Sequence, residues 1–190
     1  MTEISNIHEA EKLGVDFIGL IFVPSSPRSI SFESAKSLRK EIVKAKAVGV
    51  FMDMPSEEVN KYCSELKLDF AQLHGVPNLD LCKEINIPTI QAFRGVPNVE
   101  TTEEFLEICQ YILIDKADNE DEANFSKIAA LPNLIRSKLF LAGGLNSENI
   151  QKAVDMVNPF AVDCARGIEI EPRKKDTTKM LSFINNLPST

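Results

Sequence analysis

The residues best suited to chemistry in this chain stand directly after short apolar runs, where a side chain would project from the end of a strand. The run at residues 112–114 is followed by Asp115, a carboxylic acid that can give or take a proton. Another run ends at His74, two residues after Gln72, and a histidine in that place can act as an acid or contact a ligand. Aspartate also caps turns, and histidine also satisfies loop hydrogen bonds, so these plainer roles stay open.

Two segments that contain glycine indicate an anion site. Residues 141–146 end an apolar run with Gly143 and Gly144 and then open a helical pattern. Glycines let a phosphate approach backbone N–H groups closely, and the N-terminus of a helix favours an anion. A second segment places Arg166 and Gly167 after the final apolar run. We interpret both as phosphate-binding loops, and the alternative is a pair of tight turns.

A further candidate is Arg28, which lies in a loop stiffened by Pro24 and Pro27. A guanidinium can hold a carboxylate or a phosphate through two parallel hydrogen bonds. The alternative for this loop alone is a surface arginine in a turn.

The elements that must position these residues repeat along the chain. Short apolar runs, expected to be strands, start about 19 to 29 residues apart, which is the length of one βα unit. Between them the apolar positions recur with the period of a helix. We expect eight helical segments, the first over residues 4–13, and seven strands, at residues 17–22, 46–51, 70–73, 89–93, 111–114, 138–142 and 161–164.

Regular alternation of strand and helix, with no signal for an antiparallel hairpin, allows a doubly wound sheet or a closed barrel. A doubly wound sheet should carry a glycine-rich phosphate loop after an early strand, and none is found. We therefore predict an α/β fold, a TIM (β/α)8 barrel, as a single domain over residues 1–190. Eight helices with seven strands lead us to expect that the first strand of the barrel is missing from the sequence and precedes Met1. Counted that way, both glycine segments follow strands seven and eight, where such barrels often bind phosphate.

The composition of the chain narrows the class of partner. Of its 190 residues, 44% are hydrophobic and 26% are charged, as in an ordinary globular protein. The net charge of −7 argues against nucleic acid as a partner. No apolar run reaches the roughly 18 to 20 residues that span a bilayer, and no export signal is evident. The cysteines lack metal-ligand spacing, so we expect no metal and infer a reducing, cytoplasmic setting; they are Cys63, Cys82, Cys109 and Cys164.

Taken together, six segments resemble the phosphoribosylanthranilate isomerase family in their order and spacing. The resemblance covers nearly the whole chain, and the segments are specific as a set. They are residues 17–28 (FIGLIFVPSSPR), 48–51 (VGVF), 72–75 (QLHG), 112–115 (ILID), 141–149 (LAGGLNSEN) and 161–169 (AVDCARGIE).

The resemblance implies a step of tryptophan biosynthesis that uses no cofactor. In this Amadori rearrangement, N-(5-phosphoribosyl)anthranilate becomes 1-(2-carboxyphenylamino)-1-deoxyribulose 5-phosphate. Asp115 matches the family's acid, and Arg28 matches the residue expected near the anthranilate carboxylate. The implied partner is a small phosphorylated substrate, and the implied assembly is a monomer or a homodimer. The expected substrate-binding residues are Arg28, Gln72, His74, Gly143, Gly144, Arg166 and Gly167.

The chain departs from the family pattern in three places. The family's base is a cysteine in the first strand, which this sequence does not include. The loop after the acid, residues 116–122, is strongly acidic where the family is glycine-rich with a lysine. Ala165 and Arg166 replace a pair of serines. A substitute base is one interpretation of Cys164, but a packing thiol is the favoured one. The alternative function is therefore a drifted or non-catalytic barrel that binds a phosphosugar.

Overall fold

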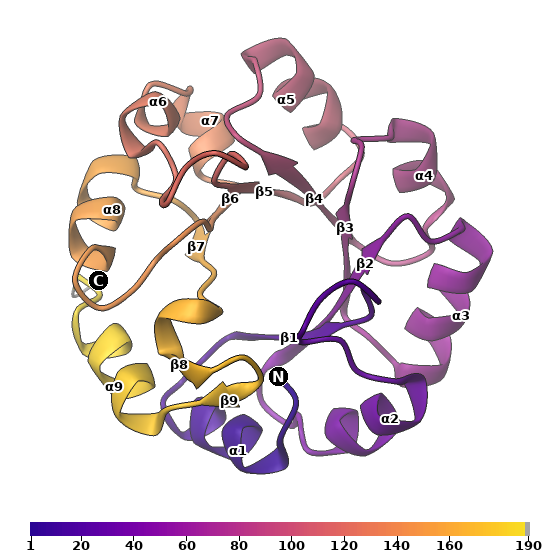
Figure 1. The fold of residues 1–190 in the computed structure, drawn as a ribbon. Coiled ribbons are helices and arrows are strands. Elements are labelled where there is room, and N and C mark those ends of the chain that lie inside the picture. The colour runs from indigo at the N-terminus through magenta and orange to yellow at the C-terminus, as the bar shows by residue number, and fades with distance from the viewer. Residues whose placement is uncertain (189–190) are drawn as a thin grey trace.

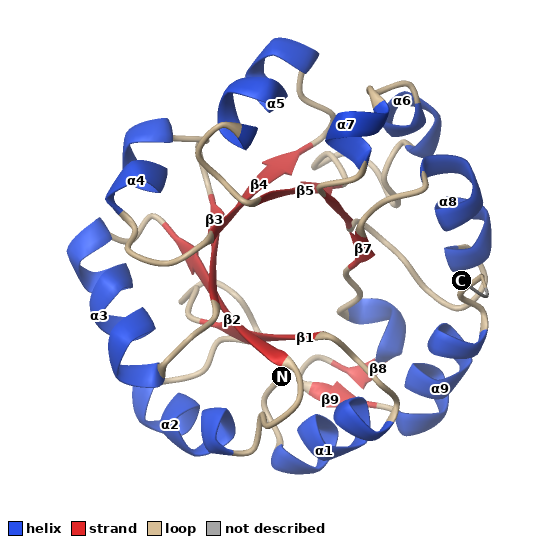
Figure 2. Ribbon diagram, turned by 180° about the vertical axis from the view of Figure 1, so that it is seen from behind, coloured by secondary structure: helices blue, strands red, loops and turns tan. Residues whose placement is uncertain are grey.

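A computed structural model describes residues 1–188. Its strands curl into a ring with helices around the outside (Figure 1 and Figure 2). The strands of the ring are parallel, and their order in the sheet is their order in the chain. They are β1 (Phe17–Ile21), β2 (Lys46–Met52), β3 (Phe70–His74), β4 (Thr89–Arg94), β5 (Tyr111–Asp115), β6 (Leu139–Leu141) and β7 (Ala161–Val162).

The helices follow the strands and form the outer layer of the ring, with one further helix before β1. They are α1 (Ile4–Lys12), α2 (Phe32–Lys40), α3 (Ser56–Leu66), α4 (Leu79–Glu84), α5 (Val99–Leu106), α6 (Phe125–Ala129), α7 (Asn133–Arg136), α8 (Ile150–Val157) and α9 (Thr177–Asn185). In the described residues 1–188, each helix is too short or too polar to cross a lipid bilayer.

β1 and β7 form the two edges of the seven-stranded sheet. A short 3-10 helix, η1 (Arg166–Ile168), and two short antiparallel strands, β8 (Glu169–Glu171) and β9 (Lys174–Lys175), lie in the arc between these edges (Figures 1 and 2). The backbone nitrogen of Met1 donates a hydrogen bond to the carbonyl of Gly19 on β1. The fold is therefore the predicted α/β barrel of the TIM type, with seven strands in the ring.

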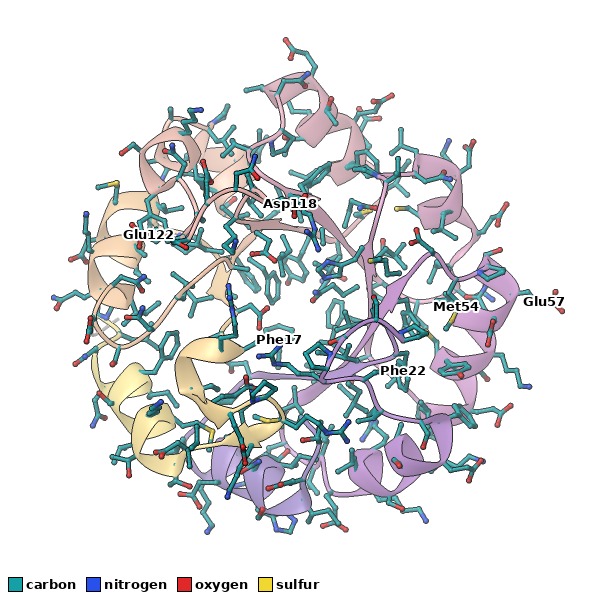
Figure 3. The ribbon with its side chains drawn as sticks, viewed as in Figure 1. Phe17, Phe22, Met54, Glu57, Asp118 and Glu122 are labelled. Carbon is teal, nitrogen blue, oxygen red and sulfur yellow. The ribbon has the colours of Figure 1, made fainter. Side chains whose placement is uncertain are left out.

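Two groups of apolar side chains stabilise the barrel. The larger lies between the sheet and the helices and includes Ile7, Val59 and Ile150, which are fully buried. The smaller fills the interior of the ring, where the Phe17 ring packs edge-on against Phe140, with their centroids 5.0 Å apart. Figure 3 shows Phe17 within the ring of strands. Because the ring is filled by side chains, a ligand site is confined to its ends.

Local sequence explains where the helices begin and end. The Ser31 side chain accepts a hydrogen bond from the backbone N–H of Ser34 at 3.2 Å, as expected of an N-cap. Asn98 does the same for Thr101 at 2.7 Å at the start of α5. Gly14 follows the end of α1 with a φ of +79°, the left-handed conformation that glycine adopts without strain.

The structure corrects two expectations about the elements. The β8–β9 hairpin is antiparallel, whereas the sequence predicted seven strands that alternate with helices and gave no signal for a hairpin. Its strands are three and two residues long, too short to produce a readable alternation. The segment between β5 and β6 also holds two helices, α6 and α7, instead of one. Pro132 stands immediately before α7, and proline is disfavoured within a helix, so the helical pattern divides there.

Candidate active site

A cavity of about 550 Å³ opens where the parallel strands end. Its walls are formed by the end of β4 and by the loops that follow β1, β5, β6 and β7. This is the end of the barrel at which enzymes of this fold carry their reactive groups. The lining residues are Arg28, Arg94, Asp115, Lys116, Asp118, Asp121, Ala142, Gly143, Gly144, Leu145, Asn146, Asp163, Ala165, Arg166 and Gly167.

The structure brings most of the expected site residues together in this cavity. They come from segments far apart in sequence, so their meeting is a product of the fold. Those in the lining are Asp115, Arg28, Gly143, Gly144, Arg166 and Gly167. Among the described residues, Gln72 and His74 lie outside the lining.

Gln72 and His74 contact each other at the end of β3. Gln72 Nε2 and His74 Nε2 lie 2.6 Å apart. Burial lowers the pKa of His74 and outweighs the opposing effect of the nearby Asp115 carboxylate. A neutral imidazole held by a neighbouring side chain fits the plainer role that the sequence left open.

Two carboxylates face the same cavity from the ends of β5 and β7, which are separated in the sheet by β6 alone. Asp115 ends β5, and its Oδ1 accepts a hydrogen bond from the backbone N–H of Lys116 at 2.8 Å. Asp163 directly follows β7. Desolvation in the mouth of the barrel raises the pKa of Asp163, and the charge of Asp115 adds to the rise. A carboxyl whose pKa is raised in a cavity is typical of sites that transfer protons.

The glycines after β6 are packed closely by the loop between β5 and α6. Gly143 has a φ of +90° and Gly144 a φ of +78°. A Cβ on Gly144 would lie 2.5 Å from the carbonyl oxygen of Asp121, and one on Gly143 would collide with the backbone of Lys116. Because these glycines lack a side chain, this loop can pack against them at the rim of the cavity. This packing role is separate from the expected binding of a phosphate.

The acidic groups of this loop are partly engaged by neighbouring residues. Asp118 forms an ion pair with Arg94 at the end of β4, and both side chains are exposed. Glu122 accepts a hydrogen bond from Asn149 Nδ2 at 3.1 Å. Figure 3 shows Asp118 and Glu122 on this loop, at the rim of the ring of strands. Lys116 Nζ is bonded to the carbonyl of Glu120 within the same loop.

Arg28 is held by the hairpin between β7 and α9. Its Nε lies 2.9 Å and 3.1 Å from the two carboxylate oxygens of Glu169, and its Nη2 also contacts Glu169. Lys175 Nζ lies 3.0 Å from the same carboxylate. The plainer interpretation, a surface arginine in a turn, is therefore wrong, because the Arg28 side chain is only 17% exposed.

Sequence reasoning did not identify four charged residues that shape the site. Asp163 lies in the segment 161–169, directly before Cys164. The signal that could have identified it is an acid immediately after an apolar run. Arg94 follows the β4 run in the same way. Glu169 and Lys175 lie in the short hairpin that the sequence did not predict.

Known proteins match the chain over almost its full length. The profile of the N-(5'phosphoribosyl)anthranilate (PRA) isomerase family matches residues 1–186. The N-(5'-phosphoribosyl)anthranilate isomerase of Oceanobacillus iheyensis is 36% identical, over 98% of this chain and 93% of its own length. The enzyme of that name from Thermotoga maritima is 36% identical, over 96% of this chain and 94% of its own.

Solved structures of the same family have the same fold. The crystal structure of phosphoribosyl anthranilate isomerase from Thermotoga maritima has a TM-score of 0.85 at 33% identity and covers 98% of this chain and 94% of its own. A phosphoribosyl anthranilate isomerase in complex with reduced 1-(o-carboxyphenylamino)-1-deoxyribulose 5-phosphate has a TM-score of 0.82 at 34% identity, with the same coverage. With its fold, its cavity and its sequence in agreement, this chain belongs to the N-(5'-phosphoribosyl)anthranilate isomerase family.

Proposed function

We propose that this chain isomerises N-(5-phosphoribosyl)anthranilate to 1-(2-carboxyphenylamino)-1-deoxyribulose 5-phosphate. The observation that carries the proposal is a single cavity, in a chain of this family, that joins an acid, a guanidinium and two glycine loops. The substrate has an aromatic carboxylate at one end and a phosphate at the other. Arg28 follows β1 and the glycine loops follow β6 and β7, and all of them line the same cavity, so one molecule can engage both.

The proposed role of Asp115 is that of the general acid. Opening the ribose ring requires a proton on the ring oxygen, and a carboxylic acid supplies one. Asp115 lines the cavity at the end of a strand, and Lys116 N–H engages its Oδ1. Asp163, whose pKa is raised, lines the same cavity and is a second carboxyl that can hold a proton there.

The proposed phosphate site lies at the other side of the cavity. Backbone N–H groups near Gly143, Gly144 and Gly167 can approach an anion closely, and Arg166 supplies a positive charge. Cys164, the adjacent thiol, does not serve as the base in this proposal. Burial raises its pKa to about 12, so it stays protonated at neutral pH.

The setting and assembly of the protein are part of the same proposal. We infer a cytoplasmic enzyme, because all four cysteines are free thiols. A phosphorylated small molecule is the partner. A monomer or a homodimer is the proposed assembly, and a related isomerase from Thermotoga maritima is described as dimeric.

The direct test is to incubate the purified chain with N-(5-phosphoribosyl)anthranilate and to separate substrate from product by chromatography. We expect conversion by the unmodified chain and none by Asp115→Asn. Binding of ribose 5-phosphate without conversion would contradict the isomerase and favour a phosphosugar-binding barrel without turnover.

A further inference from the structure

Three charged side chains form a largely buried cluster at the wall of the cavity. Arg28 belongs to the loop after β1, Glu169 to β8 and Lys175 to β9. Their side chains are 17%, 4% and 8% exposed. Lys175 Nζ also donates to the carbonyl of Ala165 at 2.8 Å, and Lys179 Nζ donates to the carbonyl of Glu169 at 2.7 Å. The Glu169 carboxylate itself accepts hydrogen bonds from Arg28 and Lys175.

The bonds to Glu169 occupy one edge of the Arg28 guanidinium. Nε and one N–H of Nη2 share that edge, and both contact the carboxylate. A planar guanidinium has a second edge, formed by Nη1 and the other N–H of Nη2. Arg28 lines the cavity, whereas Glu169 and Lys175 are not among the described residues of its lining. The second edge is therefore the part of Arg28 that can bind a carboxylate through two parallel bonds.

The charges of the cluster leave one net positive charge for a ligand. Burial opposes ionisation of Glu169, but the hydrogen bonds from Arg28 and Lys175 outweigh it and hold its pKa below the usual value. Glu169 is therefore ionised at neutral pH and would cancel the charge of Arg28 if the two stood alone. Lys175 supplies the second cation. With it, the three residues together attract an anion.

We propose that Glu169 and Lys175 are positioning residues for Arg28, which they prepare to bind the carboxylate of an aromatic substrate. Glu169 fixes the plane of the guanidinium, and Lys175 preserves the positive charge. This inference rests on the proposed function for the identity of the carboxylate. A purely structural cluster would join the loop after β1 to the hairpin and would not affect one ligand group more than another.

The experiment compares two ligands that differ in one group. The first is reduced 1-(2-carboxyphenylamino)-1-deoxyribulose 5-phosphate, and the second is the same compound without the aromatic carboxylate. The ratio of their dissociation constants, measured by calorimetry, reports the contribution of the carboxylate alone. Because both ligands keep the phosphate, affinity for the second also shows that a variant is folded.

The variants are Glu169→Gln and Lys175→Met, with Lys175→Arg as the conservative replacement. Glu171→Gln and Lys174→Met are matched controls, because they make the same changes at exposed positions of the same hairpin. We expect both test variants to lose at least tenfold in affinity for the carboxylate ligand and less than twofold for the other. Lys175→Arg and both controls should keep the unmodified ratio. If Glu169→Gln does not fold, Lys175→Met decides the question.

Each other outcome identifies what has failed. A ratio unchanged in Glu169→Gln and Lys175→Met but lost in Arg28→Ala would overturn the positioning roles and leave the proposed function standing. An equal loss of affinity for both ligands would show that the cluster has a purely structural role and would overturn the positioning roles. An unmodified protein that binds neither ligand would overturn the proposed function, and this inference with it.

Discussion

The thiol of Cys164 donates a hydrogen bond to the backbone carbonyl of Leu145, with sulfur and oxygen 3.1 Å apart. This bond links the segment after β7 to the loop after β6, beside the proposed phosphate site. Burial raises the pKa of the thiol to about 12, which keeps it a donor at neutral pH. A thiol that stays protonated cannot take a proton from the substrate. This excludes Cys164 as a substitute for the family's base.

Replacing Cys164 by serine should therefore leave turnover within about threefold of the unmodified chain, since the hydroxyl keeps the donor and the size is similar. Steady-state kinetics with N-(5-phosphoribosyl)anthranilate provide the measurement. A loss of a hundredfold or more, with the fold intact by circular dichroism, would assign the thiol to the chemistry after all.

Replacing Asp115 by asparagine should abolish turnover and leave binding of the reduced product analogue within about threefold, because the amide keeps the shape but cannot give a proton. A general acid contributes roughly 10²- to 10⁴-fold to a rate. Asp118→Asn is the matched control, since Asp118 lines the same cavity but is paired with Arg94 and exposed. Near-normal turnover in Asp115→Asn would remove this residue from the acid role.

Replacing Arg28 by alanine should lower the affinity for the reduced product analogue at least tenfold and the affinity for ribose 5-phosphate less than threefold. The reason is that the guanidinium is expected to contact the aromatic carboxylate and not the phosphate. Arg94→Ala, which removes an exposed guanidinium from the same cavity, is the comparison. Equal weakening of both ligands by Arg28→Ala would count against the assignment.

Stability should fall in acid partly through Glu11, whose Oε1 accepts backbone N–H groups of residues 43–45 at 2.7–3.0 Å. Desolvation acts to raise the pKa of Glu11, but the three backbone donors lower it below its usual value. A carboxyl whose pKa is lower in the folded state stabilises the protein above its unfolded pKa, and this contribution disappears as the pH falls through the folded value.

Glu11→Gln should therefore unfold at a lower temperature than the unmodified chain at pH 7, and the difference should shrink as the pH is lowered towards 3. Glu9→Gln is the control, because its carboxylate pairs with Lys12 on the same helix. Thermal melts followed by circular dichroism test this. A difference that stays constant across the pH range would show that the Glu11 charge has no part in it.

Lys67 directly follows α3 and has a φ of +50°, in the left-handed region. The left-handed conformation costs a residue with a side chain about 1–2 kcal/mol, and glycine's greater freedom in the unfolded chain offsets about 0.4–1 kcal/mol of the gain. Lys67→Gly should raise the free energy of unfolding by about 0.5–1 kcal/mol in urea titration. Asn158→Gly, at φ +49° after α8, should give a smaller gain because asparagine tolerates this conformation. A decrease for Lys67→Gly would contradict the strain argument.

The barrel could be predicted from the sequence because its strands are continuously apolar and evenly spaced. Phe17 and Tyr111 begin strands where the apolar runs begin, and Asp115 ends one where its run stops. The hairpin that carries Glu169 could not be predicted, since two strands of three and two residues show no period. The environment of Arg28 was equally out of reach, because its partner lies 141 residues away and depends on closure of the ring.

Each strand of the ring bonds to the strand that precedes it in sequence, so most of the sheet can assemble through short-range encounters. Contacts between the two ends of the chain differ. The Arg28–Glu169 pair spans 141 residues, and the bond from Thr2 Oγ1 to the carbonyl of Arg173 spans 171. The entropic cost of closing a loop grows with its length, and it is offset only once the intervening chain is ordered. Folding rates should therefore be insensitive to changes at Glu169, whereas unfolding should accelerate. A newly made chain should complete the environment of Arg28, the proposed carboxylate site, in the last step of folding.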